Sequence, residues 1–230
     1  MTSLSEIKRK YVIPGELIAQ GSYGIRGNML KIGDKIYATR IGMAEVGTDT
    51  IRLISLNGSY MPRLDDIVVG KVINFNAFGW QVDIESWFPA FLPAANVMGR
   101  DYSSARDSLA SQLTLGDQLL AAIAGYDRTR DPMLSISGPG LGKIAEGNTI
   151  KVSPSKVPRI IGKKGAMINA IESGSGCRLS IGQNGIIVMV GSAESVSKAT
   201  SAINLIESEA HSPGLTQKVH DILSLGDKSE

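Results

Sequence analysis

An apolar stretch in the second half of the chain is interrupted by two lysines held between two glycines. Residues 159–172 read RIIGKKGAMINAIE, and Met167, Ile168 and Ile171 recur at the spacing of one helical face. A chain that buries apolar residues on both sides of Gly162-Lys163-Lys164-Gly165 must reverse within a few residues, and glycine permits the positive φ angles that such a reversal needs. The stretch therefore predicts two short helices joined by an exposed, positively charged turn.

The flanking residues complete an α/β pattern over 145–210. Residues 148–154 (NTIKVSP) predict a strand, and 177–182 and 186–191 predict two more around Asn184-Gly185, a dipeptide typical of hairpin turns. Ser192 begins a helical pattern, and Gly174 is the expected end of the helix before it. The predicted order is β-α-α-β-β-α. The tail from residue 211 has one apolar stripe, which leaves open a short helix or a frayed end.

Residues 11–137 have a different sequence pattern, typical of β-strands. Residues 11–62 read as short, glycine-punctuated strands, which predicts a small all-β N-terminal domain. Residues 64–137 read as five strands with one long polar connection between the third and fourth, which predicts a closed β-barrel of the OB-fold type. All aromatic residues lie at or before Tyr126. We therefore expect a multidomain chain with domains at 1–62, 63–144 and 145–230.

Charge is distributed unevenly in a chain whose net charge is only +2. Residues 145–180 contain six Lys or Arg and two Glu, whereas residues 64–144 contain six basic and nine acidic residues. A basic patch on a nearly neutral protein predicts contact with a polyanion. The single Cys177 excludes an internal disulfide, and neither a signal peptide nor an apolar run of membrane-spanning length is present. We expect a soluble, cytoplasmic protein that does not contact membranes.

Motifs for catalysis are missing. The glycine-rich run at 137–143 (SGPGLGK) has Ser137 where a nucleotide P-loop needs glycine and Ile144 where it needs Ser or Thr, so we interpret it as a linker. Both histidines, His211 and His220, lie in the tail, so no nucleophile–base pair or histidine-based metal site is expected. The sequence predicts a protein without catalytic activity, cofactor or metal.

In its βααββα setting, IIGKKGAMINAIE resembles a type I KH domain, whose Gly-X-X-Gly loop clamps about four nucleotides of a single strand. The bare turn lets a phosphate approach the main chain at the start of the second helix, where the helix dipole favours negative charge. The alternative is a helix-to-helix turn with two solvated lysines. The resemblance implies RNA contacts at Gly162, Lys163, Lys164 and Gly165, with Lys156, Arg159 and Arg178 as further candidates.

Residues 68–84 (VVGKVINFNAFGWQVDI) resemble the opening of the RNA-binding barrel first known from ribosomal protein S-one. That resemblance implies base stacking on Phe78 and Trp80, with Arg128 and Arg130 nearby. The alternative is that both aromatics pack the barrel. Members of that family often have an aromatic residue at the position of Gln81 and a histidine at that of Pro93, so we expect weak RNA binding by this barrel.

The order of the three segments over residues 10–210, together with Gly182-Gln-Asn-Gly185, is similar to the RNA-binding cap subunits of the archaeal exosome. The resemblance implies a non-catalytic subunit that captures single-stranded RNA and directs its 3′ end into a phosphorolytic ring. Three caps would lie on a hexameric ring of RNase PH-like subunits, with N-terminal domains docked on it. The alternative is a free-standing KH and OB-fold factor acting in translation or ribosome assembly. A polynucleotide phosphorylase fragment is excluded, because it would place KH before the barrel.

Overall fold

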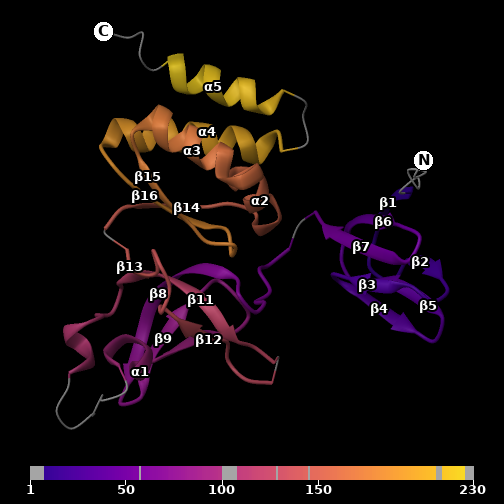
Figure 1. Cartoon of the computed structure of the whole chain (residues 1–230), viewed down its shortest axis with the longest axis horizontal. Helices are drawn as coiled ribbons and strands as arrows, with labels where there is room; N and C mark the ends of the chain where they lie inside the picture. Colours follow the sequence, from indigo (N-terminus) through magenta and orange to yellow (C-terminus); the bar gives the residue numbers. More distant parts are fainter. Residues whose placement is uncertain are drawn as a thin grey trace. The chain divides into compact units, whose positions relative to one another are not determined.

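The computed structural model describes residues 8–56, 58–99, 108–127, 129–144, 146–210 and 214–225. The chain divides into two compact units, Met1–Gly58 and Ser59–Glu230, which we call the N-terminal and C-terminal units (Figure 1). Across these described residues, no helix has the length and apolar character needed to cross a membrane.

The N-terminal unit is an all-β domain, as predicted. Its short strands form two sheets, with the orders β1-β6-β7-β3 and β2-β5-β4, around a small core that includes Val12, Ala44 and Leu53. The strands are β1 (Lys8–Val12), β2 (Leu17–Gln20), β3 (Gly24–Arg26), β4 (Met29–Ile32), β5 (Lys35–Ala38), β6 (Gly42–Val46) and β7 (Thr50–Ser55).

The smaller of these sheets is apolar on both faces. Tyr37 in β5 pairs with Leu17 on one side and Leu30 on the other, so the three side chains lie on one face. The neighbouring Ile36 points to the opposite face and is fully buried, whereas Leu17, Leu30 and Ile32 are 41%, 51% and 60% exposed. We call Leu17, Leu30, Ile32 and Tyr37 the outer apolar face.

The first part of the C-terminal unit is a closed five-stranded barrel of the OB type, as predicted. The order β12-β10-β9-β8-β11 is closed by pairing of β11 with β12, and the two-residue β13 extends the sheet beyond β11. The connection between the third and fourth strands contains α1 (Ala94–Met98) and a short 3-10 turn, Leu109–Ser111. The strands are β8 (Ile67–Asn76), β9 (Gly79–Asp83), β10 (Ala90–Pro93), β11 (Gln118–Gly125), β12 (Met133–Ser135) and β13 (Gly142–Lys143).

Trp80 belongs to the core of this barrel. Trp80, Val82 and Ile84 alternate along the chain and are all fully buried. The indole Nε1 of Trp80 donates a hydrogen bond to the carbonyl oxygen of Leu113 at 3.1 Å, which satisfies its polar atom inside the core. The prediction that Trp80 stacks on a base is therefore wrong, because no face of its ring reaches the surface.

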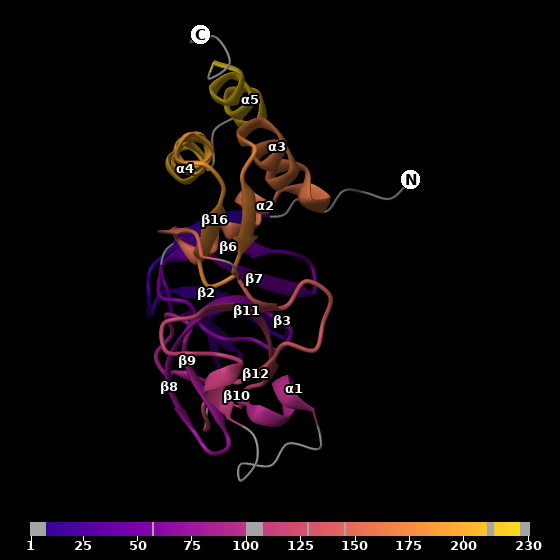
Figure 2. The ribbon, with the colours of Figure 1, turned by 90° about the vertical axis from the view of Figure 1, so that its left-hand side faces the viewer.

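The second part of the C-terminal unit is a KH domain with the predicted βααββα order. Its sheet has the order β14-β16-β15, and the helices cover the face of that sheet that is turned away from the barrel (Figures 1 and 2). The elements are β14 (Asn148–Lys151), α2 (Val157–Ile161), α3 (Ala166–Ser175), β15 (Arg178–Ile181), β16 (Ile186–Val190), α4 (Ala193–Ser208) and α5 (Leu215–Leu225).

Within the tail, residues 215–225 form the short helix that the apolar stripe left open. Leu215, Val219 and Leu223 of α5 are buried in the same core as α3 and α4. The expected end of α3 at Gly174 was wrong: α3 continues to Ser175, and Gly176 ends it with φ = 70°. Gly174 instead makes room for α5, because a Cβ atom there would lie 2.8 Å from the Cβ of Leu223.

Candidate nucleic-acid interface

The Gly162–Gly165 turn has an unusual main chain. Gly162, Lys164 and Gly165 have φ angles of 74°, 54° and 80°. A Cβ atom on Gly162 would lie 2.7 Å from the Cβ and 2.8 Å from the main-chain nitrogen of Met167, so position 162 needs glycine both for its conformation and for space. The Gly162 N–H donates to the Pro158 carbonyl at 3.0 Å, which ends α2 just before the turn.

The two lysines of this turn extend into solvent. Lys163 and Lys164 are exposed, and neither side chain forms a hydrogen bond or ion pair with any residue that the structure describes. Gly165 is the N-cap of α3 and has no side chain to accept from the first N–H groups of that helix. The Ala166 N–H at the start of α3 donates to the Lys163 carbonyl, and no side chain caps the helix. Two ammonium groups thus lie beside a helix N-terminus without a side-chain cap, an arrangement that favours an anion such as a phosphate.

Buried side chains hold the turn in place. Ile160 before it and Ile171 after it are fully buried, and Met167 is 8% exposed. Ile161, Ile168 and Ile181 pack against the same core but remain partly exposed, and we call these three residues the apolar floor. Because apolar surface next to cationic groups suits bases next to phosphates, this floor extends the anion site into a candidate site for a nucleic-acid strand.

The remaining candidates of the KH domain differ in availability. Arg159 lies in the last turn of α2 and Arg178 begins β15, and both are exposed. Lys156 is partly buried, and its Nζ donates to the main-chain oxygen of Glu207 in α4 at 2.7 Å. Its charge is therefore fixed at the C-terminal end of α4, where it complements the helix dipole.

The barrel contributes a second, separate group of candidates. Phe78 is 77% exposed in the turn between β8 and β9, while its N–H donates to Asn76 Oδ1 and its carbonyl accepts from Ala94. Arg130 is exposed in the loop between β11 and β12, and its N–H donates to Asp127 Oδ1 at 3.0 Å. Hydrogen bonds from Thr129 to that carboxylate lower the pKa of Asp127. Arg128 lies outside the described residues.

The connection between β9 and β10 exposes two aromatics that the sequence analysis did not select. Trp87 and Phe88 are 71% and 55% exposed. The Ser86 hydroxyl donates to the Phe88 carbonyl at 2.7 Å, which shapes the loop locally. A signal was available, since both aromatics follow a strand whose alternation ends at Ile84 and therefore belong to a loop.

In a second turn of the Gly-X-X-Gly type, Gly182–Gly185, the polar groups are already hydrogen-bonded to residues of the barrel. Asn184 is 4% exposed, and its amide nitrogen donates to the carbonyls of Val69 at 2.7 Å and Ile84 at 2.9 Å. Its Oδ1 accepts from the Val69 N–H, and the Gln183 N–H donates to the Ile67 carbonyl at 2.7 Å. This turn joins the KH domain to the barrel and is unavailable to a ligand.

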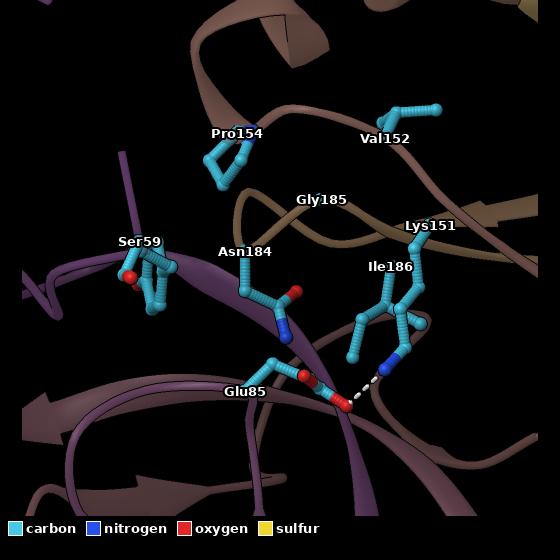
Figure 3. A pocket seen from close by; sticks show the side chains of 9 residues that line it. Ser59, Glu85, Lys151, Val152, Pro154, Asn184, Gly185 and Ile186 are labelled. Atoms are coloured by element: carbon cyan, nitrogen blue, oxygen red, sulfur yellow. Dashed lines mark hydrogen bonds and ion pairs between the residues drawn. The ribbon is translucent and has the colours of Figure 1, made fainter. Parts of the chain in front are cut away.

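A small cavity lies beside this second turn. It has a volume of about 210 Å³, and Tyr60, Pro154, Asn184 and Ile186 are among its lining residues (Figure 3). Lys151 Nζ and Glu85 Oε1 form an ion pair of 2.6 Å at this cavity, between the KH domain and the barrel. Both side chains are well exposed, so this ion pair contributes little to stability. Among all the residues that the structure describes, including those at this cavity, no three His, Cys, Asp or Glu side chains are grouped to hold a metal ion.

Comparisons with known proteins identify the family. Residues 148–205 match the KH domain model, and residues 9–57 match the model for the N-terminal domain of the exosome RNA-binding protein RRP4. The exosome complex component Rrp4 of Nitrosopumilus maritimus is 46% identical over 217 residues, covering 94% of this chain and 96% of its own. The chain belongs to the Rrp4 family of exosome complex components.

A second relative and a solved structure agree with this assignment. The Rrp4 component of Sulfurisphaera tokodaii is 39% identical over 94% of this chain and 88% of its own. A solved crystal structure described as an exosome complex RNA-binding protein superimposes with a TM-score of 0.67 at 33% identity, covering 74% of this chain and 98% of that chain. The KH match includes the charged turn, so the candidate interface lies in the part of this chain that matches the KH domain model.

Proposed function

We propose that the protein is a non-catalytic cap subunit of an exosome, and that it captures single-stranded RNA and directs the 3′ end into a phosphorolytic 3′-to-5′ exoribonuclease ring. In this proposal the domains keep the limits 1–62, 63–144 and 145–230, and three such caps lie on a hexameric ring of RNase PH-like subunits. Any shortening of RNA is performed by the ring.

The observation that carries the proposal is the Gly162–Gly165 turn. It combines two ammonium groups that have no partner among the described residues with a helix N-terminus that has no side-chain cap, and residues of the apolar floor flank it in the sequence. The positive groups can hold two phosphates of the backbone, and the floor can receive the faces of the attached bases. Arg159 at the end of α2 and Arg178 at the start of β15 add two exposed positive charges in the same domain.

Docking on the ring falls to the N-terminal unit. The outer apolar face presents Leu17, Leu30 and Ile32 to solvent with no partner among the described residues. Contiguous exposed apolar surface on a folded domain indicates a protein interface. We propose that a ring subunit covers this face. In the barrel, Phe78 and Arg130 provide a weaker contact along the path of the RNA, and Trp80 is left out because it is buried.

The test of RNA capture is a double charge reversal, Lys163→Asp with Lys164→Asp, in the full chain. Binding of an eight-nucleotide single strand, measured by fluorescence anisotropy, should weaken by about tenfold or more, because two phosphate contacts are lost. The slope of log K against log salt should become shallower by about 1.4, since each phosphate contributes about 0.7 for a single strand.

A matched control reverses two exposed lysines of the N-terminal unit, Lys31→Asp with Lys35→Asp. It makes the same change in net charge and should leave RNA affinity within about twofold if local contact, rather than total charge, determines binding. Equal losses of RNA affinity in both variants would contradict the turn as the capture site.

A pull-down of the full chain from native extract distinguishes the cap subunit from the free-standing factor. Co-purification of ribosomal subunits instead of ring-type RNases would favour the free-standing factor.

A further inference from the structure

The edge of the KH sheet carries an intramolecular contact that the proposed function leaves unused. In the order β14-β16-β15, strand β15 pairs with β16 alone among the strands that the structure describes, so its other side is an edge of this sheet. The N–H of Leu179 on that edge donates to Oε1 of Glu172 in α3 at 2.7 Å. The side chain of Glu172 therefore satisfies a main-chain donor on this edge of the sheet.

Glu172 lies on the same side of α3 as the charged turn. Gly165, Ile168 and Glu172 are separated by three and four residues, which places them along one face of a helix. Glu172 is about 9 Å along the helix axis from Ala166, which is within the span of a site for four nucleotides. The stripe thus runs from the lysine pair, across a residue of the apolar floor, to the edge of β15.

The second oxygen of Glu172 is left with hydrogen-bonding capacity. Glu172 is partly exposed, and among the described residues it forms no ion pair and Oε2 accepts no hydrogen bond. A carboxylate repels phosphates, so the backbone of a bound strand is kept at the lysine end and a base edge meets Glu172. A carboxylate is also an acceptor only, so it pairs with a donor on that base.

We propose that Glu172 determines base specificity at the end of this stripe by favouring bases with an exocyclic amino group over uracil. This inference rests on the proposed capture of RNA by the Gly162–Gly165 turn. Cytosine presents the amino group N4 where uracil presents the carbonyl oxygen O4, and a Glu carboxylate accepts from cytosine N4. At Glu172, uracil places one acceptor against another.

The experiment compares eight-nucleotide strands of cytidine and of uridine, which differ at this position of the base. The wild-type chain should bind the cytidine strand about fivefold or more tightly, the lower end of the discrimination given by one specific base contact. Cytidine strands bearing N4,N4-dimethylcytosine lose the donor without any change in the protein, and their affinity should fall to that of the uridine strand. Unchanged affinity for the dimethylated strand would overturn the inference.

The protein variant is Glu172→Gln. Its side-chain oxygen can still accept from the Leu179 N–H, while the outward atom changes from an acceptor to a donor. The cytidine preference should vanish or reverse. Glu207→Gln is the matched control, because Glu207 Oε1 likewise accepts a main-chain N–H, that of Ser153 at 2.8 Å, and the preference should be retained.

The outcomes separate the two proposals. Wild-type protein that binds both strands equally, or a Glu172→Gln chain that keeps the cytidine preference, overturns the role of Glu172 and leaves RNA capture intact. Binding of neither strand overturns capture, and the base preference with it. Binding of both strands that survives the Lys163 and Lys164 reversal shows that RNA is held elsewhere, which also overturns both.

Discussion

The KH domain contains two turns of the Gly-X-X-Gly type, one exposed to solvent and one buried against the barrel. Gly162–Gly165 places Lys163 and Lys164 in solvent, whereas Gly182–Gly185 buries Asn184 against two barrel carbonyls. Both turns need glycine for close main-chain approach: a Cβ on Gly162 would strike Met167, and one on Gly182 would lie 2.5 Å from the main-chain nitrogen of Val69. Glycine spacing alone therefore does not define a nucleic-acid clamp.

What differs is the pair of residues between the glycines and what lies across from them. The first turn joins two helices whose buried faces leave its outer side uncovered. The second turn joins two strands of a sheet whose other face packs on the barrel through Val69, Ile186 and Val188. A short amide at position 184 fits that interface because it can donate and accept at once. The following predictions test this contrast.

The largest expected effect is on stability at the second turn. Asn184→Ala removes three hydrogen bonds and leaves buried groups of Val69 and Ile84 unpaired, so we expect a loss of about 3 kcal/mol in the free energy of unfolding. Urea unfolding measures it. Asn96→Ala, which removes one partly buried bond to Leu134 within the barrel, is the control and should cost about 1 kcal/mol. A smaller loss at Asn184 than at Asn96 would contradict the account.

The glycines of the first turn should differ from one another. Gly162→Ala adds a side chain that meets Met167, and the alanine must adopt the positive φ of this position, so we expect about 2–3 kcal/mol of destabilisation and weaker RNA binding. Gly165→Ala has a positive φ but meets nothing nearer than Ile168 at 3.7 Å, so its cost should be about 1 kcal/mol. Thermal unfolding distinguishes them, and equal costs would show that the predicted steric contact is relieved elsewhere.

Making the first turn identical in sequence to the second separates charge from backbone shape. In the double variant Lys163→Gln with Lys164→Asn, asparagine suits the positive φ of position 164, so folding should be unchanged within about 0.5 kcal/mol. RNA affinity should fall by about tenfold, or about 1.4 kcal/mol, through loss of both charges. Anisotropy at two salt concentrations checks this. Retained affinity would mean that glycine geometry alone holds the strand.

The smallest effect concerns pH at the entry to the barrel, next to the second turn. Burial raises the pKa of Asp66, whose carboxylate accepts from the Tyr60 hydroxyl at 2.7 Å. A raised folded-state pKa means that this group contributes stability at low pH and loses it as pH rises from about 4 through the folded pKa. Relative to wild type, Asp66→Asn should therefore gain stability from pH 4 to pH 7, by about 0.5 kcal/mol at most. If Asp66→Asn instead lost stability relative to wild type between pH 4 and pH 7, the pKa of Asp66 would be lowered in the folded state, which contradicts the account.

Features fixed by neighbouring residues could be predicted from the sequence. The βααββα order, the five-stranded barrel and the exposed turn at Lys163 and Lys164 all follow from local periodicity and glycine placement. The burial of Trp80 could also have been predicted. Its alternation with Val82 and Ile84 marks an inward-facing position, and the family resemblance outweighed that pattern.

Features fixed by distant partners could not be predicted. Asn184 was identified as part of a hairpin turn, but its hydrogen-bond partner Val69 lies 115 positions away, and nothing local indicates that contact. The packing of α5 depends on the missing side chain of Gly174, which locally looked like a helix end. The bond between Glu172 and Leu179 depends on which strand of the sheet lies at the edge.

The most direct test of the central claim records amide chemical shifts of the full chain while a short single-stranded RNA is added. The account predicts the largest changes at Lys163, Lys164 and the first turn of α3, with Gln183 and Asn184 unmoved. Changes of equal size in both turns, or changes confined to the barrel, would contradict it.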